Sequence, residues 1–454
     1  MSHVELCERV LQSAQKRGAT EVEALILARR AIGVEIERAE IKTCSDVIDS
    51  GLAVRAITKK KIGFAFTNIL TQEEAEKTAK NAVAASKASP ADRKWKQLPE
   101  KHSYPTVRDT YDKKITKFTS DEAVVLCQTM IDTAQKVDKR VLPAFGGTEV
   151  AISESVCLNS HGVQASDIGT SLVCALGTMA RSETQVSPSC FEFRASRQYD
   201  PDPEWVAKEA AQFAIDSLNV GQPEAGKFPI LLDPFALQSI LNFTLIPPVK
   251  GDIVARGRSL FKDKTGAKVV GENITLYDNG ILPGGLNSGK MDMEGVPRQK
   301  TPIIDEGILR SFLYNNYWAR LEGQTSTGNA GRGGGGLNLP PYGTIPNISP
   351  TNLQLKTGTF TDEELLEEAD NGYYVRSVQG AHQSNPETGE FSVALAPAWR
   401  IQRGRLAHAV KGAMIAGNTY DMLKSISALG KDARQVGAFI TPKVVVSELT
   451  VITK

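Results

Sequence analysis

Helical and strand-like patterns form separate clusters along this 454-residue chain, and this grouping constrains the fold most. Apolar residues recur at helical spacing over residues 4–14, and strand-like runs follow at 22–27, 33–37, 51–57 and 62–66. Strictly alternating helices and strands would indicate a doubly wound parallel sheet. The clusters predict instead an α+β fold, with N-terminal α/β segments that contain mixed or antiparallel sheets and a larger β-rich C-terminal domain after them.

The chain is too long for one ordinary hydrophobic core, so two or three domains are expected. The predicted boundaries are an N-terminal domain at 1–87, a linker at 88–108, a central α+β domain at 109–222 and a C-terminal domain at 226–454. The linker is rich in Lys, Pro and Ser, and Trp95 is its lone predicted anchor.

Cap and turn signals mark the ends of several predicted elements. Thr71 with Glu74, and Thr119 with Glu122, have the spacing of capping boxes that begin helices. Residues 159–162, Asn-Ser-His-Gly, have the composition of a turn between two strands.

The charges of the chain are balanced, with 53 Lys and Arg residues against 52 Asp and Glu residues. This balance gives no electrostatic reason to expect direct binding to nucleic acid or to an anionic membrane surface. The longest nearly uncharged stretch, 228–249, contains four prolines and several polar residues. Such a stretch is predicted to be buried core and not a membrane span.

Six cysteines are spread along the chain without a C-x-x-C pair, and the first residues lack the pattern of a secretory signal. Both features predict reduced thiols, most of them small core side chains, in a cytoplasmic protein.

Common catalytic and metal-binding motifs are missing from the sequence. It has no G-x-S-x-G and no phosphate-binding G-x-x-x-x-G-K-[ST]. The run 331–336 fits G-x-G-x-x-G, but two prolines follow closely, so a mobile loop is expected there instead of a dinucleotide site. No two of the five histidines lie three to five residues apart. Cys157, before the predicted turn, and His161, within it, would need two distant ligands to hold a metal ion, so an ordinary strand-and-turn pair is expected there.

Three motifs in the C-terminal half carry a family resemblance. They are Asp252-x-x-x-Arg256-Gly257, Asp292-x-Glu294-Gly295-Val296 and Ser326-Thr327-Gly328-Asn329. In this order and spacing they resemble the TldD/PmbA family of peptidases and peptidase-like subunits. The resemblance implies a scaffold or peptide-binding role for Asp252, Arg256, Gly257, Asp292, Glu294, Gly295, Thr327, Gly328 and Asn329.

The zinc motif of active TldD-type members is degenerate in this sequence. In those members a His-Glu-x-x-x-His motif lies about five residues before the first motif. A gapless alignment places Asn242, Phe243 and Pro247 at its three functional positions. None of these residues can act as an imidazole ligand or a general base. The cysteine ligand that active members have near the C-terminus is also missing, because no cysteine follows Cys190.

The degenerate motif resembles that of the TldE/PmbA-like branch, which lacks zinc. The resemblance implies a non-catalytic, pseudo-enzyme subunit of a cytoplasmic TldD/TldE-type zinc metallopeptidase that acts on small or unfolded polypeptides. No catalytic residue, metal or cofactor is expected in this chain, and zinc is expected only in a TldD-type catalytic partner. Peptides are the expected ligands, no membrane association is expected, and a homodimer remains open.

Two other functions remain open. One is an independent hydrolase with an unrecognised site, for example around Asp292, Glu294 and His382. The other is an indirect effect on DNA gyrase, since a family label names such a modulator and the sequence shows no DNA-reading motif.

Structural roles also account for the singled-out motifs. For Asp292 and Glu294, the favoured interpretation is that they are turn residues with a structural salt bridge. The alternative is that they form an acid/base pair. Arg256 and Arg258 either hold a peptide carboxylate or are solvated charges. Residues 327–329 either form a tight loop that needs positive φ or present backbone groups to a substrate.

Overall fold

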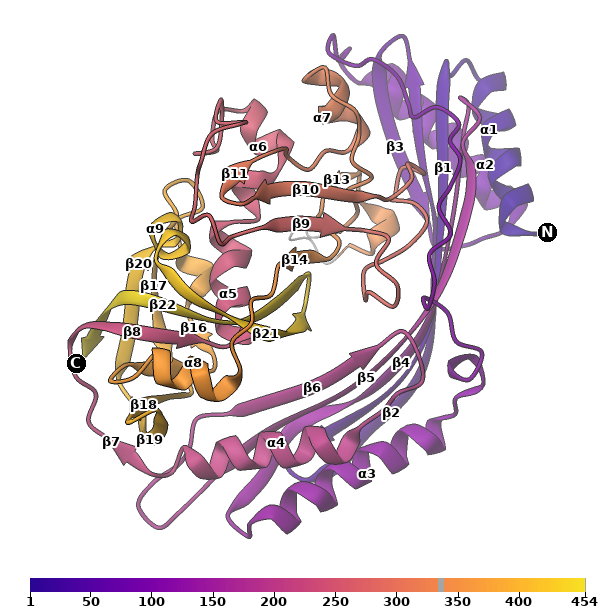
Figure 1. Cartoon of the computed structure of the whole chain (residues 1–454). Coiled ribbons are helices and arrows are strands. Elements are labelled where there is room, and N and C mark those ends of the chain that lie inside the picture. Colours follow the sequence, from indigo (N-terminus) through magenta and orange to yellow (C-terminus); the bar gives the residue numbers. More distant parts are fainter. Residues whose placement is uncertain (334–338, 454) are drawn as a thin grey trace.

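The computed structural model describes residues 1–333 and 339–453, and its N-terminal half is built on one long antiparallel sheet (Figure 1). The six strands lie in the order β3-β2-β1-β4-β5-β6. Their bounds are β1 (Glu21–Glu37), β2 (Glu40–Thr58), β3 (Lys61–Thr67), β4 (Val141–Asn159), β5 (Gln164–Ala180) and β6 (Cys190–Ser196). The helices of this half are α1 (His3–Lys16), α2 (Gln72–Ala88), α3 (Ser120–Val137) and α4 (Pro203–Asp216), with the short turn η1 (Ile115–Lys117).

The sheet bends around the C-terminal part of the chain, with its helices on the outer face (Figure 1). Because side chains alternate between the faces of a strand, even-numbered residues of β1 such as Val22 and Ile26 pack against α1 and α2. At the other end of the sheet, Val34 packs in a core with α3 and α4. The odd-numbered residues of β1, Glu23 among them, therefore face the C-terminal domain.

The C-terminal domain is built on a mixed sheet of 14 strands within the described residues. These strands are β7 (Val220–Gly221), β8 (Gly226–Leu232), β9 (Leu276–Asn279), β10 (Lys300–Asp305), β11 (Ile308–Leu309), β14 (Leu353–Leu355), β15 (Tyr373–Val375), β16 (Val378–Gln379), β17 (Glu390–Leu395), β18 (Ala398–Gln402), β19 (Arg405–Val410), β20 (Ala413–Asn418), β21 (Ile426–Val436) and β22 (Phe439–Thr453). A separate pair is formed by β12 (Ala330–Gly331) and β13 (Asn347–Ile348). The helices are α5 (Pro234–Thr244), α6 (Gly251–Ala255), α7 (Asn316–Leu321), α8 (Asp362–Glu368) and α9 (Thr419–Lys424), with the turns η2 (Pro247–Val249), η3 (Pro341–Gly343) and η4 (Ala381–Gln383).

The uncharged stretch 228–249 is buried core, as predicted. It forms β8, which lies between β22 and β15, and then α5, whose Leu237 and Ile240 are fully buried. No helix among the described residues is both long enough and apolar enough to cross a bilayer.

The predicted α+β class is confirmed, but several details differ. The runs 22–27 and 33–37 are one continuous strand, β1. Strands of the predicted N-terminal and central domains share a single sheet, because β1 pairs with β4 along most of its length. Trp95 is not the lone anchor of the linker, since Leu98 beside it is also fully buried.

The local signals hold at three places. Thr119 and Glu122 form a complete capping box, and the Thr71 side chain accepts a hydrogen bond from the Glu74 backbone N–H. The turn at 159–162 joins β4 to β5.

Five of the six cysteines are buried, and Cys44 is exposed. Of the glycine run, residues 334–336 lie outside the described part of the chain, and so does the loop predicted there.

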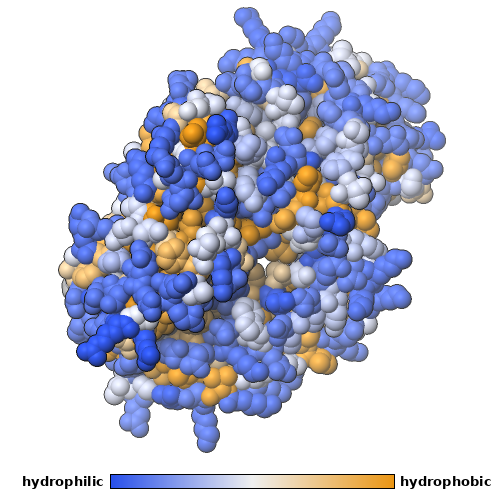
Figure 2. Space-filling model, in the orientation of Figure 1, coloured by the Kyte–Doolittle hydropathy of each residue, from blue (hydrophilic) through white to orange (hydrophobic). Residues whose placement is uncertain are grey.

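Apolar side chains gather in the recess between the sheet and the C-terminal domain. Figure 2 shows apolar side chains in the recess at the middle of the view, with a mainly hydrophilic surface around them.

Candidate functional site at the interface of the sheet and the C-terminal domain

The second and third family motifs, and Gly251 next to the first, meet at one short segment, residues 313–318, which includes the start of α7. The Gly251 N–H donates to the Leu313 carbonyl oxygen (2.9 Å), and the Tyr314 N–H donates to Thr327 Oγ1 (2.8 Å). The Asn316 N–H donates to Glu294 Oε2 (2.9 Å). Glu294 and Thr327, which belong to different motifs, are therefore held by the backbone of one segment that the sequence analysis did not single out.

Asp292 organises the turn of the second motif. Its Oδ1 accepts from the N–H groups of Glu294 (2.9 Å) and Val296 (3.0 Å), and its Oδ2 accepts from the Ala330 N–H (2.9 Å). Burial, followed by the Glu294 carboxylate, raises the pKa of Asp292 to about 7, although the three backbone donors oppose the shift. Both oxygens are used inside the fold, so this carboxylate closes a turn and joins it to β12.

Glu294 belongs to a buried ion network that crosses to the N-terminal sheet. Arg55 on β2 contacts Glu294 (2.8 Å) and Glu23 on β1 (2.5 Å), and Arg332 contacts the other oxygen of Glu23 (2.9 Å). All four side chains are less than 10% exposed. Burial alone would lower the pKa of Arg55, but the two glutamates raise it overall, so the guanidinium stays charged. Glu294 therefore does form a salt bridge, and the bridge holds two domains together.

The third motif forms a tight, buried loop beside this turn. Asn329 Nδ2 donates to Asp278 Oδ2 (2.7 Å), and Thr327 Oγ1 donates to Asn329 Oδ1 (2.6 Å). Gly328 has φ +71°, and a Cβ there would lie 2.3 Å from the Pro297 carbonyl oxygen. Positive φ and close approach both explain the glycine. The side chains of this loop bond to the protein itself.

The degenerate zinc positions lie elsewhere, at the end of α5 and the start of η2. Asn242 is half-buried, Phe243 is 36% exposed with its ring against His382 (6.5 Å between centroids), and Pro247 begins η2. The described residues contain no group of three or more His, Cys, Asp and Glu side chains that could hold a metal ion. The donor set at this position therefore does not fit zinc.

The other predicted residues have surface or separate positions. Asp252 is in α6, and the exposed Arg256 lies over the Trp318 ring (5.2 Å). Arg258 pairs with Glu387 in solvent. His161 pairs with Glu21 (3.0 Å). His382 packs edge-on against Phe243 of α5, and no contact in the described structure joins it to Asp292 or Glu294.

Replacing Phe243 with alanine is expected to cost about 1–2 kcal/mol of stability, less than for a fully buried ring, because over a third of its surface is exposed. Asn242→Ala is expected to leave the fold unchanged. Thermal melts followed by circular dichroism would measure both. A loss from Phe243→Ala as large as that of a core aromatic would show that the ring packs more tightly than its exposure indicates.

A second buried ion network joins the sheet and the C-terminal domain at the other end. Glu192 on β6 accepts from Arg376 (2.5 Å) and from Arg434 Nη1 (3.0 Å), and Arg376 also contacts Asp233, the cap of α5 (2.8 Å). Motif inspection did not find either network. The available signal was a charge inside an apolar run, as at Glu23 and Arg55.

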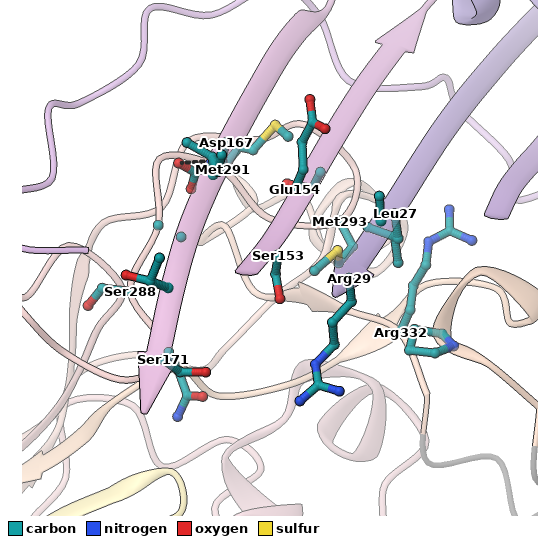
Figure 3. Close-up of a pocket in the computed structure, with 18 of the residues that line it drawn as sticks. Leu27, Arg29, Ser153, Glu154, Asp167, Ser171, Ser288, Met291, Met293 and Arg332 are labelled. Carbon is teal, nitrogen blue, oxygen red and sulfur yellow. Dashed lines mark hydrogen bonds between the residues drawn. The ribbon is translucent and has the colours of Figure 1, made fainter. Parts of the chain in front are cut away.

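A cavity of about 600 Å³ lies between the sheet and the C-terminal domain. Figure 3 shows its lining residues coming from both sides, with Leu27 and Asp167 on the strands and Ser288, Met293 and Arg332 on C-terminal segments. Its volume falls in the range of ordinary small-ligand sites.

Family models for the PmbA/TldA metallopeptidase match three parts of the chain. The first domain matches residues 22–86, the central domain 113–218 and the C-terminal domain 225–453. These matches define a protein of the PmbA/TldA metallopeptidase-like class. The chain belongs to the PmbA/TldD family.

Individual relatives agree with this assignment. An uncharacterized protein of Methanocaldococcus jannaschii is 31% identical over 438 residues, which cover 96% of this chain and 98% of that protein. The metalloprotease TldD homolog of Buchnera aphidicola (subsp. Acyrthosiphon pisum) is 25% identical over 414 residues, with coverage of 88% and 83%. The crystal structure of TldE from Thermococcus kodakarensis is similar with a TM-score of 0.93 and 28% identity, and the match covers 98% of this chain and 99% of that one.

Proposed function

We propose that this chain is a non-catalytic, TldE-like subunit that assembles with a TldD-type zinc metallopeptidase and helps it to act on small or unfolded polypeptides. One observation carries the proposal. The second and third family motifs keep a buried, hydrogen-bonded scaffold, whereas the zinc-motif positions hold Asn242, Phe243 and Pro247, which supply neither ligand nor base. The six unpaired cysteines favour a cytoplasmic location for this assembly.

An independent hydrolase is less well supported by the contacts. The oxygens of Asp292 and Glu294 accept hydrogen bonds from Val296, Ala330, Asn316 and Arg55, so neither carboxylate is placed to activate a water or to protonate a leaving group. The proposal therefore gives this chain a role in assembly and in holding peptide.

Assembly and metal content test the proposal directly. The purified chain is expected to hold no zinc after gel filtration, and to elute with a TldD-type subunit as one complex when the two are mixed. An obligate interface buries on the order of 2,000 Å² or more, so the complex should survive dilution on the column. Elemental analysis of each peak gives the zinc content.

The TldD-type subunit alone is the matched control for metal, since it should hold one zinc per chain. One zinc per copy of this chain, retained against mild chelation, would contradict the proposal. So would elution of the two proteins as separate peaks at micromolar concentration.

A further inference from the structure

The cavity between the sheet and the C-terminal domain is lined by arginines, and one of them, Arg298, has donor nitrogens that bond to no described protein group. Four arginines and three carboxylates line it. Two of the arginines are paired outside the cavity, Arg29 with Glu149 (2.5 Å) and Arg332 with Glu23 (2.9 Å). The two remaining arginines are Arg197 and Arg298.

Arg298 has terminal nitrogens without a partner. Its Nε donates to the Met291 carbonyl oxygen (2.9 Å), and within the described ranges neither Nη makes a hydrogen bond and no carboxylate lies within 4.0 Å. The side chain is deeply enclosed yet keeps part of its surface accessible, as expected for a group that faces a cavity. A guanidinium with two free donors suits a carboxylate, which can accept both bonds at once.

Arg197 adds charge but no free donor. Its nitrogens donate to the carbonyl oxygens of Thr170 (2.6 Å), Leu286 (3.0 Å), Ser288 (3.2 Å) and Thr110 (2.9 Å), which fixes the loop before Met291 against the sheet. Burial, and then the charge of Arg298, lowers the pKa of Arg197, so the two guanidiniums are close enough to repel each other.

The carboxylates of the cavity are held by other donors. Asp167 accepts from the backbone N–H groups of Ile168 (3.1 Å) and Lys290 (2.7 Å), and Asp49 accepts from the Tyr342 hydroxyl (2.7 Å). Asp167 is the one lining carboxylate that acts on the pKa of both Arg197 and Arg298. Outside the cavity lining, the buried Asp292 and Asp278 act on Arg298 more strongly than Asp167 does. The case for a carboxylate ligand therefore rests on the two free Nη nitrogens of Arg298, whose planar geometry a carboxylate matches.

Apolar side chains form the rest of the wall. Leu27 comes from a strand, and Met291 and Met293 come from the C-terminal domain (Figure 3). Ile168 on β5 and Tyr342 in η3 also line the cavity. Methionines adapt to side chains of different shapes, so this wall suits an apolar residue without selecting one.

We propose that this cavity binds the C-terminal end of a short peptide, with Arg298 holding the free carboxylate and the apolar wall holding the last side chain. This inference deepens the proposed function, because it names the part of the substrate that this subunit holds. It concerns this chain alone, so it can fail while the partnership stands, or hold without it.

Isothermal titration calorimetry on the purified full chain, without partner, tests the inference. The probes are a tripeptide of two alanines and a C-terminal leucine as the free acid, the same peptide as its amide, and inorganic phosphate. The free acid is expected to bind about tenfold or more tightly than the amide, because the amide loses a charge-assisted pair. Arg298→Met is expected to lower the affinity for the free acid by a similar factor.

Arg29→Met is the matched control, since it removes one charge from the same cavity at a residue that already has a partner. It should bind the free acid like the unaltered chain. Equal affinity for acid and amide, an equal loss in both variants, or tighter binding of phosphate than of the free acid would each overturn the inference. If Arg298→Met does not fold, the comparison of the free acid with the amide on the unaltered chain still tests the inference.

Discussion

Alone, this chain is expected to hydrolyse no polypeptide, whereas mixed with a TldD-type subunit it is expected to form part of an active peptidase. Amide hydrolysis at neutral pH needs an activated nucleophile and a stabilised oxyanion. A zinc site supplies both by lowering the pKa of its bound water and polarising the carbonyl. The positions of that site hold Asn242, Phe243 and Pro247 in this chain. The measurement is the cleavage rate of an unfolded, fluorescently labelled polypeptide by each protein and by the mixture.

Two variants locate the chemistry within the mixture. Changing the partner's motif glutamate to glutamine should reduce cleavage to background, because the family resemblance implies that this residue is the general base. Asn242→Ala in this chain should leave the rate unchanged. Cleavage by this chain alone, or cleavage that persists without the partner's glutamate, would show that this chain has its own catalytic site.

Arg55→Met is expected to lower the free energy of unfolding by about 3–5 kcal/mol, the largest stability loss expected from a single substitution here. The guanidinium is 6% exposed and touches two buried glutamates, and Glu294 has no other cation partner in the described structure. The substitution leaves that carboxylate buried with the Asn316 N–H as its remaining donor. Urea unfolding followed by circular dichroism measures the loss, and because Arg55 bridges two domains the transition is also expected to broaden or split.

Arg30→Met is the matched control, because Arg30 lies on the neighbouring strand and pairs with Asp46 in solvent. Its urea midpoint should stay within experimental scatter of the unaltered protein. Equal midpoints for the two variants would mean that the buried network does not hold the domains together. The double variant with Glu294→Gln should recover part of the loss, since it removes the unpaired charge.

Local sequence patterns predict the positions of most helices and strands but not which of them pair or pack together. The capping box at Thr119 and the turn at 159–162 depend on neighbouring residues, so short-range chemistry was enough to place them. β1 was divided in two because Arg29 and Arg30 interrupt its apolar alternation. The shared sheet could not be predicted, because the register of β1 with β4 is set by contacts between residues more than 100 positions apart.

The candidate site also combines features set by neighbouring residues, which the sequence predicts, with contacts between distant residues, which it does not. The turn at Asp292 and the glycine at 328 follow from local backbone needs, and the sequence pointed to both. The partners of Glu294 are Arg55, from the second strand, and Asn316, from a loop without a motif. Arg298 and its cavity exist only once two domains are packed together, so no stretch of sequence carries their signature.

The pairing of β1 with β4 also means that one edge of β1 stays unpaired during synthesis until β4 has been translated. Glu37 ends β1 and Val141 begins β4, so roughly 100 residues must be translated before the partner strand appears. At about 5–20 residues per second, one edge of β1 stays open for on the order of 10 s. An open edge of such a long strand can recruit foreign strands, and the charges of Arg29 and Arg30 at its middle oppose this. A nascent or truncated product that stops before residue 141 keeps that edge unpaired, which makes it a substrate for chaperones or a seed for aggregation.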